Sequence, residues 1–409
     1  MIKRTHPSLP IPNPIYGSEL GSFAHDTVVR RLPAIVKRAI DENDFSEEII
    51  RDLQTLITEI PDRPIRHLED LKAPDEKEWQ RCIQPHLGIN WLEVPWFFAE
   101  FYLYRRILES TRYFRPGERG YLKDPYALQK QLGLESAKVT LQPLAASVNR
   151  WIADQAGMPD VIHRALMVAL WGNKADMSLW PIRGGDHAQI KQAEMDSEKI
   201  IINDSQIVVE YLCGLKPGTS RIDLLLDNAG FELVADLCLA DVLLSSGLAG
   251  KVVLRPKAYP VYVSDAMVKD VGDTLVFMER QLSPEIDLMS KRLRNLLQEG
   301  RLTFQVDTFW TLPLALWEMP ESLRIDLDHS DLLISKGDAH YRRLLGDRHW
   351  PPDTPFADIM SYLSPSILAL RLGKSEVACG LEPGRVESLH QKDPGWMTDG
   401  EWGWIQFKR

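Results

Sequence analysis

The stretch Leu224-Leu225-Leu226-Asp227-Asn228-Ala229-Gly230-Phe231-Glu232 gives the clearest indication of the fold, because an apolar run gives way there to an acid, an amide and a glycine. The run from Arg221 to Leu226 is short, apolar and flanked by glycines, which favours a buried strand in a parallel sheet. The residues from Phe231 to Ser246 have a helical pattern. Asp227 and Asn228 would then lie at the carboxyl end of a strand, where open α/β sheets bind ligands, beside helix N–H groups that favour phosphate. The alternative is that both side chains only cap the helix.

The pattern of the chain changes near residue 195. Before that point we predict helices, over Phe23–Asp41, Ser46–Glu59, Trp91–Ser110, Tyr126–Leu134, Leu141–Asp154 and Met158–Trp171. After it, short β-branched or leucine runs alternate with amphipathic stretches; the runs are Ile200–Ile202, Ile222–Leu226, Val252–Leu254, Leu332–Ser335 and Ile367–Leu370, and Trp402–Phe407 is a candidate last strand. Such alternation is typical of βα units. We therefore predict an all-helical domain over 1–195 and an α/β domain with a mostly parallel sheet over 196–409.

Composition excludes several classes of protein. With 409 residues and 44% hydrophobic content, the chain can bury a large core. A net charge of -10 without any Lys/Arg block argues against a nucleic-acid partner. No window approaches about eighteen uncharged apolar residues, and the amino terminus lacks the apolar core of a signal peptide, so we expect no membrane partner. We predict a cytoplasmic protein, with the nucleus as the alternative location.

Familiar cofactor and zinc motifs are missing from the sequence. The four cysteines show no CxxC spacing and are predicted to be reduced core residues. The ten histidines contain no HExxH, which argues against a zinc hydrolase. No GxGxxG follows a predicted strand and no Walker lysine motif occurs, so nucleotide cofactors lack their usual signal.

Polar side chains follow five of the predicted strands. If the strands are parallel, all of these groups lie at one edge of the sheet, where the crevice of such a fold is found. Oxygen ligands from Asp and Asn suit Mg²⁺ or Mn²⁺, and nearby cations would neutralise a phosphoryl group. A single lysine after a strand is more often a solvated loop charge, so the prediction depends on the convergence of the five clusters. They are Asn203-Asp204-Ser205, Asp227-Asn228, Ser264-Asp265, Lys336-Gly337-Asp338 and Arg371-Leu372-Gly373-Lys374, with Arg342 close behind the fourth.

Three further motifs leave alternatives open. The polar cluster Trp171-Gly172-Asn173-Lys174-Ala175-Asp176 is either part of a site or the end of a helix. Trp96 to Arg106 is predicted to pack an aromatic helix face into the core, and a pocket role for Glu100 is the less favoured interpretation. Asp326-Leu327-Asp328 looks like the DxD of phosphatases that form an aspartyl phosphate, but it precedes its strand and so lies at the wrong end.

Several of these motifs resemble the damage-control phosphatase family, in its sugar-phosphate subgroup. The resemblance extends from Ser22-Phe23-Ala24-His25 through Pro95-Trp96 to Ile405-Gln406-Phe407, nearly the whole chain. It implies a helical amino-terminal domain on a three-layer α/β/α, Rossmann-like domain. The implied cofactor is Mn²⁺, or Mg²⁺, Co²⁺ or Ni²⁺, held by Asp227, Asn228 and Asp265. The motifs that carry it are Leu170-Trp171-Gly172-Asn173-Lys174-Ala175-Asp176, Leu226-Asp227-Asn228-Ala229-Gly230-Phe231-Glu232-Leu233, Val263-Ser264-Asp265 and Lys336-Gly337-Asp338.

The resemblance also implies the substrate and the residues that bind it. The family acts on phosphorylated sugars such as fructose 1-phosphate or fructose 6-phosphate. Asp338-Ala339-His340-Tyr341-Arg342 looks like the substrate-binding segment and Lys374 like the phosphate-binding lysine. One departure concerns substrate preference: the subgroup motif Arg-Thr-x-Lys reads Arg371-Leu372-Gly373-Lys374 here. The predicted substrate-binding set is completed by Asn173, Glu232, Lys336 and Arg371.

The leading hypothesis is metal-dependent hydrolysis of a sugar phosphomonoester, with Asp227, Asn228, Asp265 and Lys374 as the catalytic residues. The nucleophile is either water, oriented by Asp265 or Asp338, or a carboxylate, for which Asp227 is the less favoured candidate. A second hypothesis is an S-adenosylmethionine-dependent protein carboxyl methyltransferase, since Glu232 matches a position assigned to that cofactor. A third is a non-catalytic sugar-phosphate sensor, against which the presence of all three expected metal ligands argues.

Overall fold

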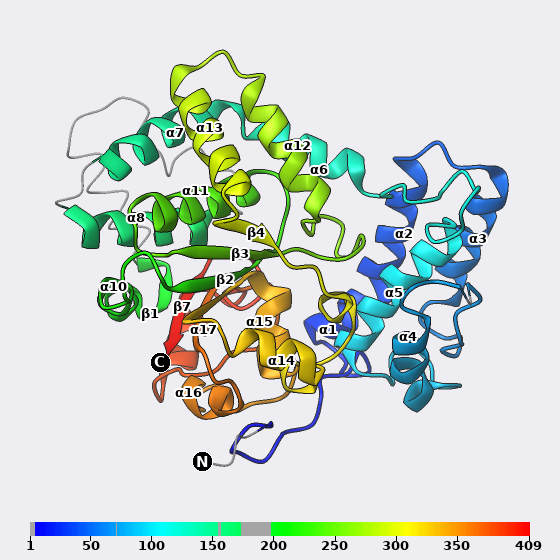
Figure 1. Cartoon of the computed structure of the whole chain (residues 1–409). Helices are drawn as coiled ribbons and strands as arrows, with labels where there is room; N and C mark the ends of the chain where they lie inside the picture. Colours follow the sequence, from blue (N-terminus) through cyan, green and yellow to red (C-terminus); the bar gives the residue numbers. More distant parts are fainter. Residues whose placement is uncertain (1–4, 71, 154–156, 173–197) are drawn as a thin grey trace.

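A seven-stranded sheet lies at the centre of the molecule (Figure 1), in the order β1-β7-β6-β5-β2-β3-β4. The computed structural model describes residues 5–70, 72–153, 157–172 and 198–409. The strands are β1 Ile200–Asn203, β2 Arg221–Leu225, β3 Lys251–Arg255, β4 Leu302–Phe304, β5 Leu332–Lys336, β6 Ser366–Leu372 and β7 Gly403–Lys408. All the predicted strands are present, including the candidate last one, and only β4 lacked a sequence prediction.

Helices make up most of the chain before the sheet and connect its strands afterwards. The first group is α1 Phe23–Asp26, the π-helical turn η1 Thr27–Arg31, α2 Leu32–Asp41, α3 Glu47–Glu59, α4 Glu76–Ile83, α5 Trp96–Ser110, α6 Ala127–Ser136, α7 Lys138–Ala153 and α8 Met158–Trp171. The second is α10 Ser205–Cys213, α11 Phe231–Ser245, α12 Val268–Glu279, α13 Pro284–Gln298, α14 Glu321–Leu327, α15 Gly337–Leu345, α16 Phe356–Ile359 and α17 Arg385–Lys392. The six predicted amino-terminal helices are confirmed, and α4 was not predicted.

Five of the strands run in the same direction. Successive strands of the set β6-β5-β2-β3-β4 pair in parallel, which confirms the mostly parallel sheet. β7 returns antiparallel to β6, and β1 pairs in parallel with β7. The carboxyl ends of β1 and β7 therefore lie at the opposite edge from those of β2, β3, β5 and β6. The expectation that Asn203, Asp204 and Ser205 join the other polar clusters is thus wrong; Asp204 instead accepts a hydrogen bond from the Phe407 N–H at 2.8 Å.

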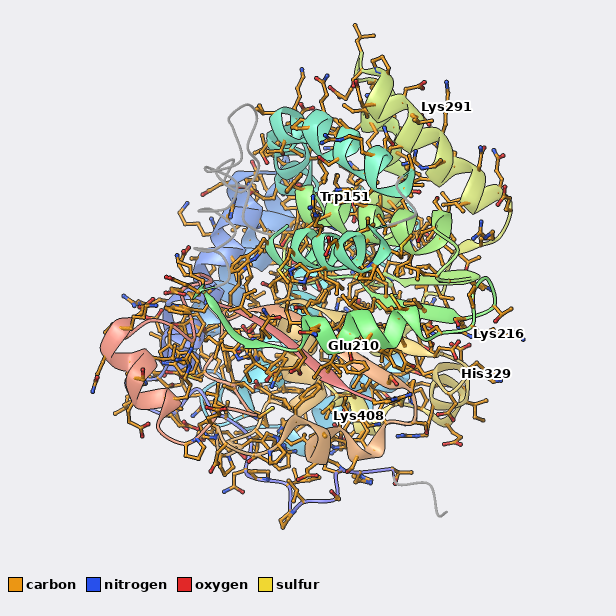
Figure 2. The ribbon with its side chains drawn as sticks, turned by 90° about the vertical axis from the view of Figure 1, so that its left-hand side faces the viewer. Trp151, Glu210, Lys216, Lys291, His329 and Lys408 are labelled. Carbon is orange, nitrogen blue, oxygen red and sulfur yellow. The ribbon has the colours of Figure 1, made fainter. Side chains whose placement is uncertain are left out.

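The two faces of the sheet are covered by different helices, which gives the α/β/α layering (Figure 1). Ile222 and Leu224 of β2 point into a core shared with α7, α8, α11 and α13, whereas Leu225 points into a core shared with α5 and α15. In Figure 2, Lys291 of α13 lies on the outer side of the layer formed by α7, α8, α11 and α13, away from the sheet. Its side chain is 70% exposed. The predicted domain boundary near 195 falls in 173–197, outside the described residues. No helix in the described ranges is both long and apolar enough to cross a membrane.

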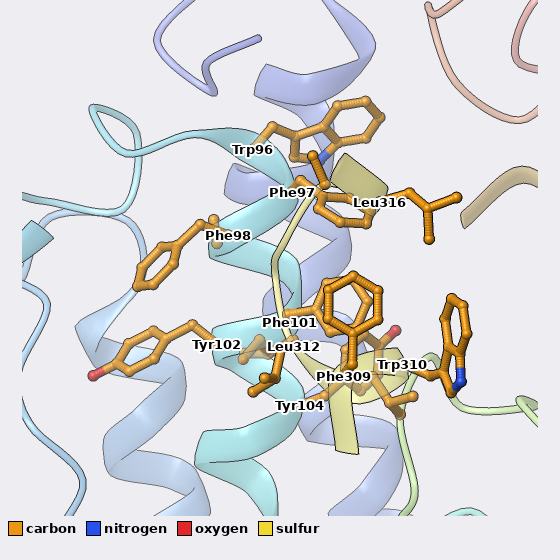
Figure 3. Close-up of a cluster of buried hydrophobic side chains, with 14 of the residues drawn as sticks. Trp96, Phe97, Phe98, Phe101, Tyr102, Tyr104, Phe309, Trp310, Leu312 and Leu316 are labelled. Carbon is orange, nitrogen blue, oxygen red and sulfur yellow. The ribbon is translucent and has the colours of Figure 1, made fainter. Parts of the chain in front are cut away.

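Helix α5 connects the amino-terminal helices to the α/β layers. It begins at Trp96 rather than the predicted Trp91, because the residue before Pro95 is sterically disfavoured from helical backbone angles. All fifteen of its residues are buried, so the predicted packing of its aromatic side chains into the core is confirmed. Phe101 and Phe309 belong to the same buried cluster (Figure 3), and the Arg343 guanidinium lies 5.1 Å and 5.2 Å from the centroids of their rings. The aromatic side chains of α5 therefore fix this helix against the segment that follows β4.

All four cysteines are free, in agreement with the predicted reduced state. Cys238 and Cys379 are buried as expected. Cys213 is exposed and Cys82 only half-buried, so the expectation that all four lie in the core is wrong. Cys213 is the last residue of α10, a helix that covers the sheet with one face only.

Candidate functional site

A cavity of about 450 Å³ opens at the carboxyl ends of the parallel strands. Its floor lies where β2 is flanked by β5 and β3, the point at which the strand order changes direction. Eight predicted site residues line this cavity: Asp227, Asn228, Glu232, Asp265, Asp338, Ala339, Arg342 and Lys374. Leu372, which replaces the threonine of the subgroup motif, lines it as well. Asn173 lies outside the described residues. Because the carboxyl ends of parallel strands meet at one edge of the sheet, side chains that are more than a hundred positions apart in the sequence line the same cavity.

Two loops that carry the expected metal ligands are joined through their backbones. The Ala266 N–H donates to the Asp227 carbonyl at 2.7 Å, and the Ala229 N–H donates to the Ser264 carbonyl at 2.7 Å. These bonds hold the backbone of Asn228 beside that of Asp265. As a result, the three expected ligand side chains start from a single short piece of paired backbone.

The loop before Asp265 is conformationally strained. Tyr262 and Val263 both have positive φ, 48° and 57°, a region that costs non-glycine residues about 1–3 kcal/mol. The Tyr262 ring packs edge-on against Phe101 and its hydroxyl donates to Glu100 Oε2 at 3.2 Å. Contacts with α5 thus stabilise a backbone conformation that the isolated loop would not prefer.

Gly337, the first residue of α15, lies directly beside the Asp227 carboxylate. Its φ is 78°, and a Cβ added there would lie 1.9 Å from Asp227 Oδ2. A side chain at this position would therefore displace the carboxylate. Asp227 also lies close to the amino terminus of α15, whose N–H groups and dipole favour negative charge.

Asp227 is the carboxylate of this site that lacks a basic partner within the described residues. It is 6% exposed, and the Asn228 amide nitrogen donates to its Oδ2 at 2.8 Å. Burial, followed by the negative charges of Glu232 and Asp265, raises the pKa of Asp227 well above its usual value. Such a crowded, desolvated carboxylate is stabilised by a cation.

The donor set fits a hard divalent cation. No group of three His, Cys, Asp or Glu side chains in the described ranges is arranged to hold a metal. The expected set instead combines two carboxylates with the amide of Asn228, all oxygen ligands of the kind that Mn²⁺ or Mg²⁺ takes. The Asn228 oxygen accepts a hydrogen bond from Ser264 Oγ, which leaves its second lone pair free for a metal.

The other cavity carboxylates on the sheet side have basic partners. Lys257 Nζ lies 3.2 Å from Asp265 Oδ2, and burial raises the pKa of Asp265 to about 6 against the opposing charge of Lys257. Lys336 is buried behind the wall and pairs with Glu232 at 3.0 Å and with Asp236 at 2.8 Å. Lys336 therefore neutralises two acids of this chain, rather than lining the cavity as a free cation.

Asp338 is held in place by three donors on one oxygen. Its Oδ1 accepts from Arg371 Nε at 2.8 Å, from the Lys374 N–H at 3.2 Å and from Ser375 Oγ at 3.0 Å. Arg371 is itself buried behind the cavity wall. The structure thus gives Arg371 a positioning contact with Asp338, and within the described contacts Oδ2 of Asp338 stays available to a ligand.

The predicted segment 338–342 divides between the cavity and the protein interior. Ala339 and Arg342 line the cavity, whereas His340 and Tyr341 do not. The His340 Nε2 lies 2.8 Å from Lys257 Nζ, and burial and the charge of Lys257 lower the pKa of His340 well below its usual value. The Tyr341 hydroxyl donates to Gln406 Oε1 at 2.6 Å in the core. On a nine-residue helix, only one face can contribute to the cavity.

A second wall, which the sequence did not reveal, comes from the amino-terminal helices. Its residues from α1, η1 and α2 are Phe23, Thr27, Arg31, Ile35 and Arg38, and those from α5 are Trp96, Glu100 and Tyr104. Glu100 contributes to the cavity, the interpretation that was less favoured. The four-residue spacing from Phe23 to Ile35 was a usable signal, since it marks one helix face. Nothing local to the sequence shows that this face meets the end of the sheet.

The Asp326-Leu327-Asp328 motif lies away from the cavity. Asp326 is in α14 and pairs with Arg221 Nη2 at 3.1 Å and with Arg255. Arg221 begins β2, so the motif lies near the amino end of the strand, as the sequence predicted. Asp326 therefore has a structural ion-pair partner and no contact with the ligand cavity.

The fold and the cavity define an open α/β protein with a ligand site at the switch point of its sheet. The family model of the damage-control phosphatase ARMT1-like domain matches residues 27–389. The damage-control phosphatases ARMT1 of Danio rerio and Xenopus tropicalis are 31% and 32% identical, each over 95% of this chain and over 95% and 96% of their own lengths. The protein of that name from Homo sapiens is 29% identical over 97% of this chain and 98% of its own length.

The chain therefore belongs to the damage-control phosphatase family, in its ARMT1-like branch. This confirms the resemblance inferred from the motifs. A crystal structure of a DUF89 family protein from Pyrococcus horikoshii aligns with a TM-score of 0.48 and 13% identity, over 94% of this chain and 98% of the other.

Proposed function

We propose that this protein is a divalent-metal-dependent phosphatase that hydrolyses phosphomonoesters of small sugars, in a metabolite damage-control role. Membership of the damage-control phosphatase family supports the phosphatase activity. The observation that carries metal dependence is Asp227, a buried carboxylate beside two other acids and without a basic partner in the described chain. Mn²⁺ is the proposed cation, held by Asp227, Asn228 and Asp265, and Mg²⁺, Co²⁺ or Ni²⁺ would suit the same oxygen ligands.

The cavity residues have different roles in the proposed hydrolysis. A bound divalent cation supplies Lewis-acid polarisation of a phosphoryl oxygen. Lys374, at the cavity wall, neutralises the charge that grows on the phosphoryl oxygens, usually the largest contribution in this chemistry. Asp338, fixed through its Oδ1, can orient a water molecule with its other oxygen. Water is therefore the nucleophile that the arrangement favours, since Asp227 is committed to the cation.

The sugar would lie between the sheet edge and the second wall of the cavity, which is formed by α1, η1, α2 and α5 and is called the helical wall below. Glu232, Ala339 and Leu372 line this space. Leu372, which replaces the threonine of the subgroup motif, therefore lies where the sugar is expected. Leu372 presents a methyl surface in place of the hydroxyl of the subgroup motif, and this changes which sugar hydroxyl is favoured there. The proposed partners are small sugar phosphates, with the protein acting in the cytoplasm.

The proposal is tested by phosphate release from a panel of sugar phosphates and a chromogenic phosphate, with Mn²⁺, Mg²⁺, Co²⁺ or a chelator. We expect turnover that needs a divalent cation and is lost in Asp227→Ala. The same preparations are assayed for methyl transfer from S-adenosylmethionine to protein carboxylates. Methyl transfer without phosphate release would support the methyltransferase instead, and binding of sugar phosphate without either reaction would support a sensor.

A further inference from the structure

The basic residues in and behind the cavity wall differ in whether they have acidic partners. Most are paired: Arg342 with Glu100 and Asp347, Lys336 with Glu232 and Asp236, Lys257 with Asp265, Arg371 with Asp338, and Arg38 with Glu42. Within the described part of the chain, the side chains of Arg31 and Lys374 have no carboxylate partner, although both line the cavity. A cation that faces a cavity without an acid to neutralise it is available to an anionic ligand.

The two unpaired cations lie near different acids of the cavity. Burial raises the pKa of Glu100, and the charges of Arg342 and, more weakly, Arg31 act against that shift. Lys374 follows β6, and its backbone N–H donates to Oδ1 of the cavity acid Asp338 at 3.2 Å. Lys374 therefore lies at the sheet edge, and Arg31 lies over the Phe23 ring, which packs on Trp96 of α5. One phosphate at the metal site would leave Arg31 without an anionic partner.

The backbone directs Arg31 into the cavity. In a regular α-helix, with 3.6 residues per turn, residues at four-residue spacing drift around the axis. The π-helical turn η1, Thr27–Arg31, takes more residues per turn and reverses this drift, so Phe23, Thr27, Arg31 and Ile35 all reach the same cavity. The Arg31 guanidinium lies over the Phe23 ring, 4.8 Å from its centroid. This contact orients the guanidinium without using its hydrogen-bond donors.

We propose that Arg31 is a specificity-determining residue that binds a second anionic group, a phosphate or a carboxylate, at the non-reacting end of the substrate. The proposal rests on the proposed function and narrows its substrate class to sugar phosphates with two anionic ends. Lys374 binds the phosphate that is hydrolysed, and Arg31 binds the distal one. The cavity volume of about 450 Å³ lies in the range of small-molecule sites.

The test compares fructose 1,6-bisphosphate with fructose 1-phosphate as probes, in the full chain with Mn²⁺. Binding constants are measured by titration calorimetry and kcat/KM by phosphate release, for the wild type, Arg31→Gln and Arg31→Lys. A matched control is Arg30→Gln, because the Arg30 side chain is 76% exposed, does not line the cavity and pairs with Asp26. A phosphorylated sugar acid replaces the bisphosphate in a second arm, which separates a distal carboxylate from a distal phosphate.

We expect Arg31→Gln to lower the preference for the doubly anionic probe by about tenfold, since one charge-assisted hydrogen bond at a partly exposed site is lost. Arg31→Lys should recover most of that preference, Arg30→Gln should retain all of it, and added salt should weaken it. An equal effect of Arg31→Gln on both probes, or no effect on either, overturns the proposal. If the wild type binds with the expected preference but releases no phosphate, the phosphatase function fails while the role of Arg31 stands. If it binds neither probe, both fail.

Discussion

The two walls of the cavity are built differently. The sheet-edge wall carries Asp227 directly after β2, Asp265 in the loop that follows β3 and Asp338 at the start of α15 after β5. Backbone or side-chain hydrogen bonds hold each of them. The helical wall offers Arg31 from an amino-terminal helix and Glu100 from α5. Chemistry that needs fixed geometry is expected at the first wall, and discrimination between substrates at the second. A single cavity thus combines a fixed group of oxygen ligands on the sheet edge with a second surface built from separate helices.

The largest expected effect is on the sheet-edge wall and concerns Gly337. Gly337→Ala would bring a Cβ to 1.9 Å from Asp227 Oδ2, so the carboxylate must move. We expect phosphatase activity to fall about a hundredfold, as displacements near 1 Å can cause in active sites. The measurement is kcat/KM for phosphate release at saturating Mn²⁺.

A matched control separates this displacement from backbone strain. Gly300 has φ 70° and nothing within 4 Å of an added Cβ. Gly300→Ala and Gly337→Ala should both lose about 1 kcal/mol of unfolding free energy, since both place alanine in the left-handed region. Equal activity in the two variants would show that the position of Asp227 is not important for the reaction.

The second prediction concerns the paired charges of the helical wall. Glu100 and Asp347 both pair with the buried Arg342, whose guanidinium also lies 3.6 Å from the centre of the Trp96 ring. Glu100→Gln should lower the free energy of unfolding by about 2 kcal/mol, because a buried cation loses one of two charged partners. Urea denaturation measures the change. Glu118→Gln is the control, because Glu118 is exposed; an unchanged midpoint in Glu100→Gln would show that Asp347 alone stabilises Arg342.

The smallest expected effect tests the contact between the two walls. Tyr262→Phe removes the hydrogen bond to Glu100 but keeps the ring against Phe101. The free energy of unfolding should fall by about 1 kcal/mol, the usual contribution of one intramolecular hydrogen bond. Tyr121→Phe, at an exposed ring, should change it by less than about 0.5 kcal/mol. A loss of activity in Tyr262→Phe far larger than its loss of stability would mean that this hydroxyl also positions Asp265.

The residues of the sheet-edge wall could be predicted because the pattern that marks them, a polar cluster after an apolar run, is local in the sequence. Asp227, Asp265, Asp338 and Lys374 each follow an apolar run, and parallel pairing brings the ends of such runs together. The same rule gave a wrong position for Asp204, since β1 pairs with the antiparallel β7 and strand direction at a sheet edge is set by long-range pairing.

The helical wall escaped prediction for the same reason. Ile35 and its neighbours show only that one face of a helix is apolar or mixed, and which surface that face meets depends on contacts hundreds of positions away. Lys336 is a related case, because it ends strand β5 and its partners Glu232 and Asp236 belong to helix α11, about a hundred positions earlier in the chain. Local patterns thus predict which residues are reactive more readily than which charges are already neutralised.

We expect Asp227 to belong to a divalent-cation site, and this expectation underlies the proposed function. Calorimetric titration of Mn²⁺ into the apo wild type, Asp227→Asn and Asp204→Asn tests it directly. Asp204 is the matched control, a half-buried acid that follows a strand at the opposite edge of the sheet. We predict binding of Mn²⁺ by the wild type and by Asp204→Asn, and a loss of at least about tenfold in affinity in Asp227→Asn, in line with the removal of one charged ligand. Equal Mn²⁺ affinity in all three proteins would show that Asp227 is not a ligand of the cation.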